Sequence, residues 1–121
     1  MIKENINDFF NDTQRIGPFL GIDLGEKRVG LSISDRTQSI ASNYATIEKK
    51  KFSLFSLDLQ AIIDKEIICG IVIGLPLNMD GSEGPKCQST RHFAKNFSTI
   101  VNLPITFWDE RLTTVAAERS L

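Results

Sequence analysis

The sequence has few cysteines, a single histidine and no long apolar run, and each shortage narrows the class of protein. Two cysteines in 121 residues, without a basic leader and a following apolar stretch, favour reduced structural thiols over a disulfide scaffold. His92 falls on an expected helix away from the strand ends, so we expect it at the surface or in packing. No apolar run reaches the roughly 18 to 20 residues that span a bilayer. We therefore expect a cytoplasmic protein with no membrane partner.

An excess of basic charge is also missing. Fourteen Lys and Arg residues against fifteen Asp and Glu residues give a formal net charge of −1. The whole chain therefore lacks the positive surplus of proteins that hold duplex nucleic acid mainly through its phosphates. A local basic rim is still compatible with this balance, and its candidates are Lys27, Arg28, Lys49, Lys50, Lys51, Arg91 and Arg111. For Lys49 to Lys51, a solvated loop or helix entry is the preferred interpretation.

The length and apolar content of the chain are sufficient for one folded domain. An apolar content of 41% in a chain of this length can bury a single core without a metal or disulfide. Residues 1–18 mix polar and apolar side chains and end in Gly17 and Pro18, so we expect an N-terminal extension there. Residues 19–121 then form the domain.

The apolar pattern predicts alternating strands and helices. We expect strands at residues 19–23, 29–34, within 39–47, 67–73 and 104–108, and helices after Ser53, from about Pro85, and after Thr113 or Thr114. Gly25 gives backbone freedom to a hairpin turn at residues 24–28, and the third strand completes an antiparallel meander. This order predicts a mixed α/β sheet with helices packed on its faces.

Carboxylates stand where two of these strands end. Asp23 closes the first strand, and Asp109 and Glu110 close the last. Ligands bind at the carboxyl ends of parallel strands in open α/β sheets, so these side chains converge if the two strands are neighbours. Clustered carboxylates repel unless a cation such as Mg²⁺ or Mn²⁺ binds, and two such ions can promote phosphodiester hydrolysis. For Asp23 alone, a turn-forming role before Gly25 is an equally good interpretation.

Three segments in order resemble the YqgF family of pre-16S rRNA nucleases, which are also described as Holliday-junction-resolvase-like proteins. They are Gly21 to Gly30 (GIDLGEKRVG), Ile71 to Ser82 (IVIGLPLNMDGS) and Asp109 to Thr114 (DERLTT). The resemblance implies an α/β, RNase H-like fold with a mixed five-stranded sheet and helices on both faces. It also implies a divalent metal and a nuclease that trims the 5′ end of the small-subunit rRNA precursor during ribosome biogenesis. Resolution of branched DNA (Holliday junctions) is the other activity that the family implies.

The resemblance also assigns roles to single residues. Asp23 matches the first family acid and Glu110 the second, as catalytic residues and metal ligands. Asp109 is less favoured, because adjacent residues on a strand point to opposite faces. Family members continue through a further helix with a third acid, and this sequence stops at Leu121. We therefore expect a domain that lacks this helix, with reduced metal affinity and turnover.

Further residues are candidates for substrate binding. Asn78 and Asp80 lie in a polar loop after the central strand, where they contact substrate or simply form turns. Lys27 and Arg28 lie in the first hairpin, beside Asp23. They either contact the scissile backbone of the nucleic acid or remain solvated. Arg111 binds phosphate or pairs with Asp109. The expected partners are pre-16S rRNA or branched DNA, and a second copy of the chain.

Two alternative functions stay open at this point. An RNA- or ribosome-binding remnant keeps the fold and loses cleavage, so it binds RNA in a salt-dependent way without hydrolysis. The segment that begins at Asp23 also resembles the first phosphate loop of actin-like ATPases. Those proteins need a second phosphate loop and a second domain, for which 121 residues are too few.

Overall fold

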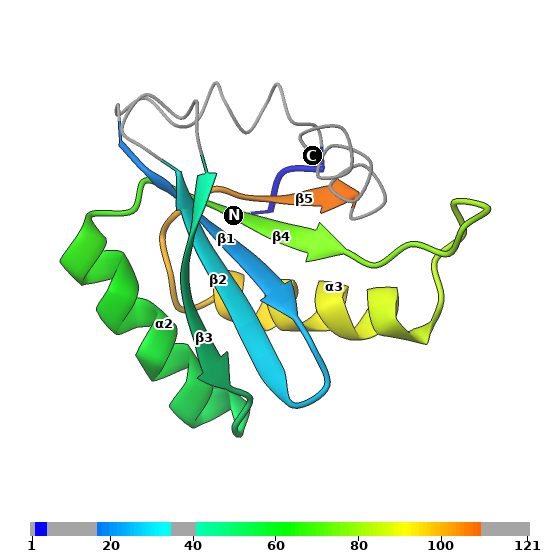
Figure 1. The fold of residues 1–121 in the computed structure, drawn as a ribbon, viewed down its shortest axis with the longest axis horizontal. Helices are drawn as coiled ribbons and strands as arrows, with labels where there is room; N and C mark the ends of the chain where they lie inside the picture. Colours follow the sequence, from blue (N-terminus) through cyan, green and yellow to red (C-terminus); the bar gives the residue numbers. More distant parts are fainter. Residues whose placement is uncertain (1, 5–16, 35–40, 110–121) are drawn as a thin grey trace.

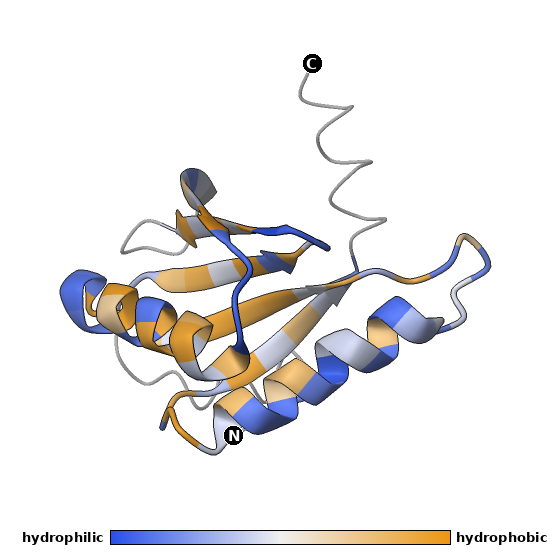
Figure 2. Ribbon diagram, turned by 90° about the horizontal axis from the view of Figure 1, so that it is seen from below, coloured by the Kyte–Doolittle hydropathy of each residue, from blue (hydrophilic) through white to orange (hydrophobic). Residues whose placement is uncertain are grey.

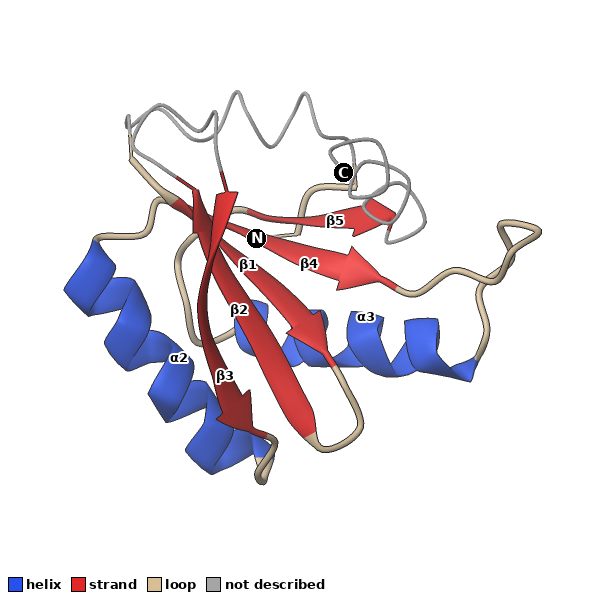
Figure 3. Cartoon of the chain, in the orientation of Figure 1, coloured by secondary structure: helices blue, strands red, loops and turns tan. Residues whose placement is uncertain are grey.

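The protein is built around a mixed β-sheet, seen here in a computed structural model that describes residues 2–4, 17–34 and 41–109 (Figure 1). In this part of the chain the sheet has five strands in the order β3-β2-β1-β4-β5. The strands are β1 (Phe19–Leu24), β2 (Arg28–Ser34), β3 (Ala41–Glu48), β4 (Gly70–Leu75) and β5 (Ile105–Asp109). The described helices are α2 (Phe52–Glu66) and α3 (Pro85–Ser98) (Figure 3). The predicted mixed sheet is confirmed.

The first three strands form the predicted antiparallel meander. β1 pairs with β2, and β2 pairs with β3, in antiparallel register. The turn between β1 and β2 closes through a hydrogen bond from the Gly25 N–H to the Arg28 carbonyl, at 2.9 Å. β4 then lies parallel to both β1 and β5. Parallel neighbours need a crossover connection. Between β1 and β4 this connection includes β2, β3 and α2, and between β4 and β5 it includes α3.

One face of the sheet carries the main core. Side chains at alternating strand positions are buried there, including Leu20 and Ile22 on β1. Phe55 of α2 and Phe97 of α3 belong to the same cluster. Figure 2 shows both helices on this one side of the sheet. Within the described ranges the opposite face carries no helix, and the helix expected after residue 113 falls on residues 110–121, outside the described part.

Two predicted element boundaries are wrong. α2 begins at Phe52 with Lys51 as its N-cap, and the Lys51 carbonyl accepts hydrogen bonds from the N–H groups of Leu54 and Phe55. Ser53, the expected N-cap, therefore lies inside the first turn. β4 begins at Gly70, later than expected, because Ile67 adopts a left-handed conformation (φ 55°) and ends α2.

Residues 2–4 lie along the outer edge of β5. Ile2 forms a parallel bridge with Ile105, and the Lys3 N–H donates to the Ile105 carbonyl at 2.6 Å. The rest of the predicted N-terminal extension, residues 5–16, lies outside the described residues.

Both cysteines are free thiols, as predicted. Each is buried, and the Cys69 thiol donates to the Gly17 carbonyl at 3.2 Å. None of the helices in the described ranges is long and apolar enough to cross a membrane. His92 is exposed on α3, with its Nε2 atom 3.1 Å from the Asn96 side-chain nitrogen, so the predicted surface position is confirmed.

Candidate functional site

Asp23 lies near the carboxyl end of β1 and is exposed. Its neighbour Ile22 is buried in the core beneath the helices, so the alternation of a strand directs Asp23 to the opposite face. We call this the open face, because neither of the described helices packs on it. Gly30 of β2 is its cross-strand partner. A Cβ atom at Gly30 would stand 3.8 Å from the Asp23 Cβ, so the glycine leaves the space beside the carboxylate open.

Glycine also lies on the other side of Asp23. Ile22 pairs with Ile73 of β4, which places Gly74 next in the row, and Gly74 pairs with Trp108 of β5. The open face therefore carries a row across four strands at the carboxyl end of β1. It consists of Gly30, Asp23, Gly74 and Trp108, and we call it the glycine row. Its only carboxylate is flanked by glycine on both sides, so a large ligand can approach it closely.

The first and last strands are not neighbours, so the condition set for convergence of their carboxylates is not met. β4 lies between β1 and β5, because the strand order is β3-β2-β1-β4-β5. The sequence pattern could not settle this point, since it gives the order of strands along the chain and not across the sheet. Side chains from β1 and β5 thus meet only across β4, at roughly 10 Å between strand axes.

Asp109 belongs to the helix-covered face. Phe107 packs against the core on that face, and alternation puts Asp109 on the same side and Trp108 on the other. Asp109 and Asp23 therefore lie on opposite faces of the sheet. Glu110 and Arg111, the other candidates at this strand end, lie outside the described residues.

Basic side chains gather at the hairpin that follows Asp23. Lys27 and Arg28 are exposed in and beside the turn. Lys49, just after β3, joins them: its N–H donates to the Lys27 carbonyl at 2.9 Å, and its Nζ donates to the Gly25 carbonyl at 3.2 Å. The sequence made Lys49 a candidate for a basic rim, with a solvated loop as the preferred interpretation, and the β2–β3 pairing shows that it lies against the hairpin.

The loop after β4 is held in shape by its own polar groups. The Gly81 N–H donates to the Asn78 carbonyl at 2.8 Å, and Gly81 takes a positive φ of 88°. Asp80 Oδ1 accepts from both the N–H and the hydroxyl of Ser82, at 2.9 and 2.6 Å. The Asn78 amide donates to the same hydroxyl at 3.0 Å. The loop is thus a built turn, and substrate contact by Asn78 and Asp80 stays a prediction.

Arg91 of α3 anchors the end of this loop. It makes a two-pronged ion pair with Glu83, at 2.7 and 2.9 Å, and a second ion pair with Glu4 at 2.6 Å. Its guanidinium lies 4.8 Å from the ring centre of Phe107. The hydrogen bond from Arg91 lowers the pKa of Glu83, and the same bond raises the pKa of Arg91. Arg91 is therefore engaged with protein groups and is not a free cation of the basic rim.

The chemistry of Asp23 suits a hard divalent cation, because Mg²⁺ and Mn²⁺ prefer carboxylate oxygen. The described residues hold no group of three His, Cys, Asp or Glu side chains that could bind a metal by itself. Asp23 therefore supplies one fitting ligand on the open face.

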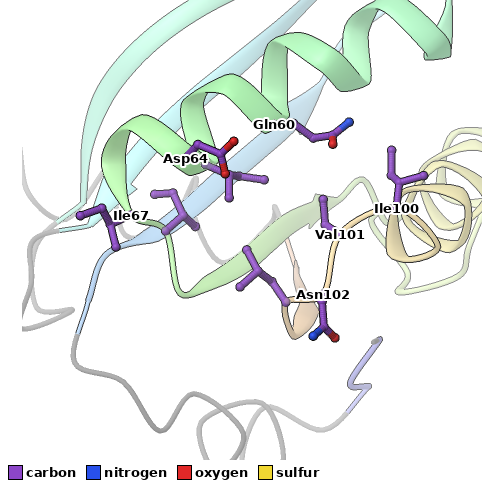
Figure 4. Close-up of a pocket in the computed structure, with 9 residues that line it drawn as sticks. Gln60, Asp64, Ile67, Ile100, Val101 and Asn102 are labelled. Carbon is purple, nitrogen blue, oxygen red and sulfur yellow. The ribbon is translucent and has the colours of Figure 1, made fainter.

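A separate hollow lies at the other end of the sheet. It measures about 390 Å³ and opens between the end of α2 and the segment after α3. Figure 4 shows Gln60, Asp64 and Asn102 at its walls among isoleucine and valine side chains. Asp23 does not line it, so this hollow is distinct from the glycine row.

Comparison with known proteins connects this geometry to a family. The family model described as "RuvX: Holliday junction resolvase" matches residues 17–121. Relatives from Ruegeria pomeroyi and Rhodobacter capsulatus, each named "Putative pre-16S rRNA nuclease", are 50% identical over the whole chain. The match spans 79% and 76% of their lengths, respectively.

Solved structures share the fold at low identity. Thermus thermophilus RuvC in complex with a Holliday junction substrate superposes with a TM-score of 0.55 at 8% identity, over 77% of this chain and 64% of RuvC. Archaeoglobus fulgidus Pelota gives 0.51 at 10% identity, over 86% of this chain and 29% of Pelota.

The mixed sheet, its strand order and the RuvC likeness define the class as an RNase H-like α/β domain. Within that class the chain belongs to the RuvX family, which is the YqgF family that the sequence motifs indicated.

Proposed function

We propose that this chain is a divalent-metal-dependent endonuclease that hydrolyses phosphodiester bonds during 5′-end maturation of pre-16S rRNA. The observation that carries the proposal is the exposed Asp23 carboxylate between two glycines, at the carboxyl end of a central strand of an RNase H-like sheet. The names of relatives at 50% identity support the substrate. This maturation step belongs to ribosome biogenesis, and we propose that the protein acts in the cytoplasm.

In this proposal Asp23 and Glu110 are the catalytic residues and hold Mg²⁺ or Mn²⁺. The bound cation would supply Lewis-acid activation of a water molecule and stabilise the leaving oxygen. The position of Asp23 on the open face supports its proposed role as a metal ligand. Glu110 is proposed from the sequence motif, since Asp109 occupies the helix-covered face.

Other residues of the chain position the nucleic acid. Gly30 and Gly74 leave room for a phosphate to approach the carboxylate. Lys27 and Arg28 attract the backbone on one side of Asp23, and Arg111 is proposed to bind a further phosphate. Asn78 and Asp80 are proposed to face the substrate from the loop after β4.

The test is cleavage of a 5′-extended small-subunit rRNA precursor in Mg²⁺ and in Mn²⁺. Asp23→Asn keeps the size of the side chain and removes its charge, so we expect a loss of at least about 100-fold in rate with the fold intact. Asp109→Asn is the matched control on the opposite face and should retain most activity. Equal cleavage by wild type and Asp23→Asn would overturn the proposal. RNA binding without cleavage would favour the binding remnant.

A second candidate activity is resolution of Holliday junctions, which the family description favours. The same variants with a four-way DNA junction test it. Cleavage of the junction and not of the precursor RNA would assign the active site to branched DNA.

A further inference from the structure

Trp108 is an exposed aromatic side chain in the glycine row, two strands away from the Asp23 carboxylate. It lies on β5, the last strand in the sheet order, and is 39% exposed. It stands at the end of β5 with Gly74 as its partner on β4. Alternation along β5 directs it to the open face, because Phe107 packs into the helix-covered core and Arg91 of α3 contacts the Phe107 ring.

Between Trp108 and Asp23 there is only a glycine. Gly74 of β4 fills the intervening place in the row and has no side chain. Two strand spacings separate the backbones of Trp108 and Asp23, roughly 10 Å in all. A nucleotide lying along this row would have its phosphate near the carboxylate and its base over the aromatic ring.

We propose that Trp108 is a stacking platform for a nucleobase of the substrate, one that is unpaired or unstacked near the scissile phosphate. The inference rests on the proposed nuclease function and deepens it by naming what the open face recognises. An indole offers a flat apolar surface to any base, and base–aromatic stacking tolerates different sequences. A base within a continuous duplex cannot reach this face of the ring, so the platform selects single-stranded or branched substrate.

Trp108 also reports on its own contact, because it is the only tryptophan in the chain. Stacking of a base quenches indole fluorescence, whereas loss of protein stability does not produce a ligand-dependent quench. The measurement is a titration of wild-type protein, with a chelator present to keep the nucleic acid intact. Anisotropy of a dye on the nucleic acid records binding independently.

Three nucleic-acid probes distinguish whether the base that stacks on Trp108 comes from single-stranded RNA or from a DNA junction. They are a precursor RNA with a single-stranded 5′ extension, the same RNA with abasic sites through the extension, and a four-way DNA junction. We expect the intact extension or the junction to quench Trp108, and the abasic RNA to bind without quenching. Quenching by the RNA alone assigns the platform to an RNA base, and quenching by the junction alone assigns it to a branch-point base.

Substitutions test how much Trp108 contributes to binding affinity. Trp108→Leu should weaken binding on the order of 5-fold and raise KM with little change in kcat, while Trp108→Phe stays close to wild type. Tyr44→Leu is the matched control, since Tyr44 is an equally exposed aromatic (37%) on β3, at the far edge of the sheet. Binding that leaves Trp108 emission unchanged, or a Trp108→Leu variant with wild-type affinity and KM, would overturn the platform and leave the nuclease standing. Absence of any nucleic-acid binding by wild type would overturn both.

Discussion

At the scale of single residues, Arg91 of α3 joins three separate segments of the described chain. Its guanidinium binds Glu83 in the loop after β4 and Glu4 in the N-terminal segment, and it also covers the Phe107 ring of β5. A planar guanidinium suits this task because it donates in several directions and stacks on an aromatic face. An Arg91→Lys exchange would keep the charge and lose the two-pronged geometry.

The Glu83–Arg91 pair should make stability depend on pH in one direction. The hydrogen bond from Arg91 lowers the pKa of Glu83 below its usual 4.5. A carboxylate with a lowered pKa in the folded state stabilises fully above the pKa of the unfolded chain, and this contribution is lost as pH falls through the folded pKa. We expect wild type to melt at a higher temperature than Glu83→Gln at neutral pH, by a few degrees at most, because the pair is solvent-accessible.

Thermal melts of both proteins at pH 7 and pH 3 check this expectation. The gap in Tm should close at pH 3 and shrink in high salt. A gap that stays constant across this range would show that Glu83 contributes through packing and not through charge.

At the scale of elements, the β1–β2 hairpin depends on Gly25. A Cβ atom at that position would stand 2.5 Å from the Arg28 carbonyl oxygen, which already accepts the Gly25 N–H. The obstacle is backbone, so it cannot move aside as a flexible side chain would. Gly30, in the same hairpin, meets nothing closer than 3.8 Å.

These two glycines make a matched pair for mutation. Gly25→Ala should lower the free energy of unfolding by about 1–3 kcal/mol, because the turn must distort. Gly30→Ala should change it by less than about 1 kcal/mol. Denaturant unfolding of the two variants measures both values, and equal losses would contradict the steric explanation. Distortion at Gly25 should also reduce cleavage, since Asp23 lies two residues away.

Local elements were largely predictable from the sequence, and long-range arrangement was not. Alternating Val29, Leu31 and Ile33 predicted β2, and the helical spacing of Phe93 and Phe97 predicted α3. The strand order and the pairing of residues 2–4 with β5 depend on contacts between distant segments, which no local pattern records.

The same limit applies to the candidate site. Asp23 was identified because an acid at a strand end is a local feature. Trp108 was not assigned to the site, and Lys49 was only one of seven candidates for a basic rim, because their places follow from the pairing of β5 with β4 and of β3 with β2. Glu110 stays a prediction from the motif.

At the scale of the whole molecule, a near-zero net charge is compatible with a local group of cations. Lys27, Arg28 and Lys49 share one end of the sheet near Asp23, although the chain as a whole carries a formal charge of −1. Local cations release counterions from nucleic acid regardless of the total charge.

Salt dependence of binding should expose this arrangement. Lys49→Ala should lower the slope of log affinity against log salt by about 0.7 to 0.9, the value of one phosphate contact. Lys65→Ala, in the last turn of α2, is the control and should leave the slope unchanged. Anisotropy titrations from low to moderate salt give both slopes, and equal slopes for the two variants would remove Lys49 from the interface.

The pairing of residues 2–4 with β5 has a consequence for synthesis on the ribosome. The Lys3 N–H finds its acceptor at Ile105, and Glu4 finds its cation at Arg91. Residues 2–4 are synthesised about 100 residues before Ile105, and synthesis proceeds at about 5–20 residues per second. During this interval the meander of β1, β2 and β3 can form from local contacts, whereas the outer edge of the sheet cannot form until β5 has been synthesised. Residues 2–4 are therefore synthesised well before the strand that fixes them in place.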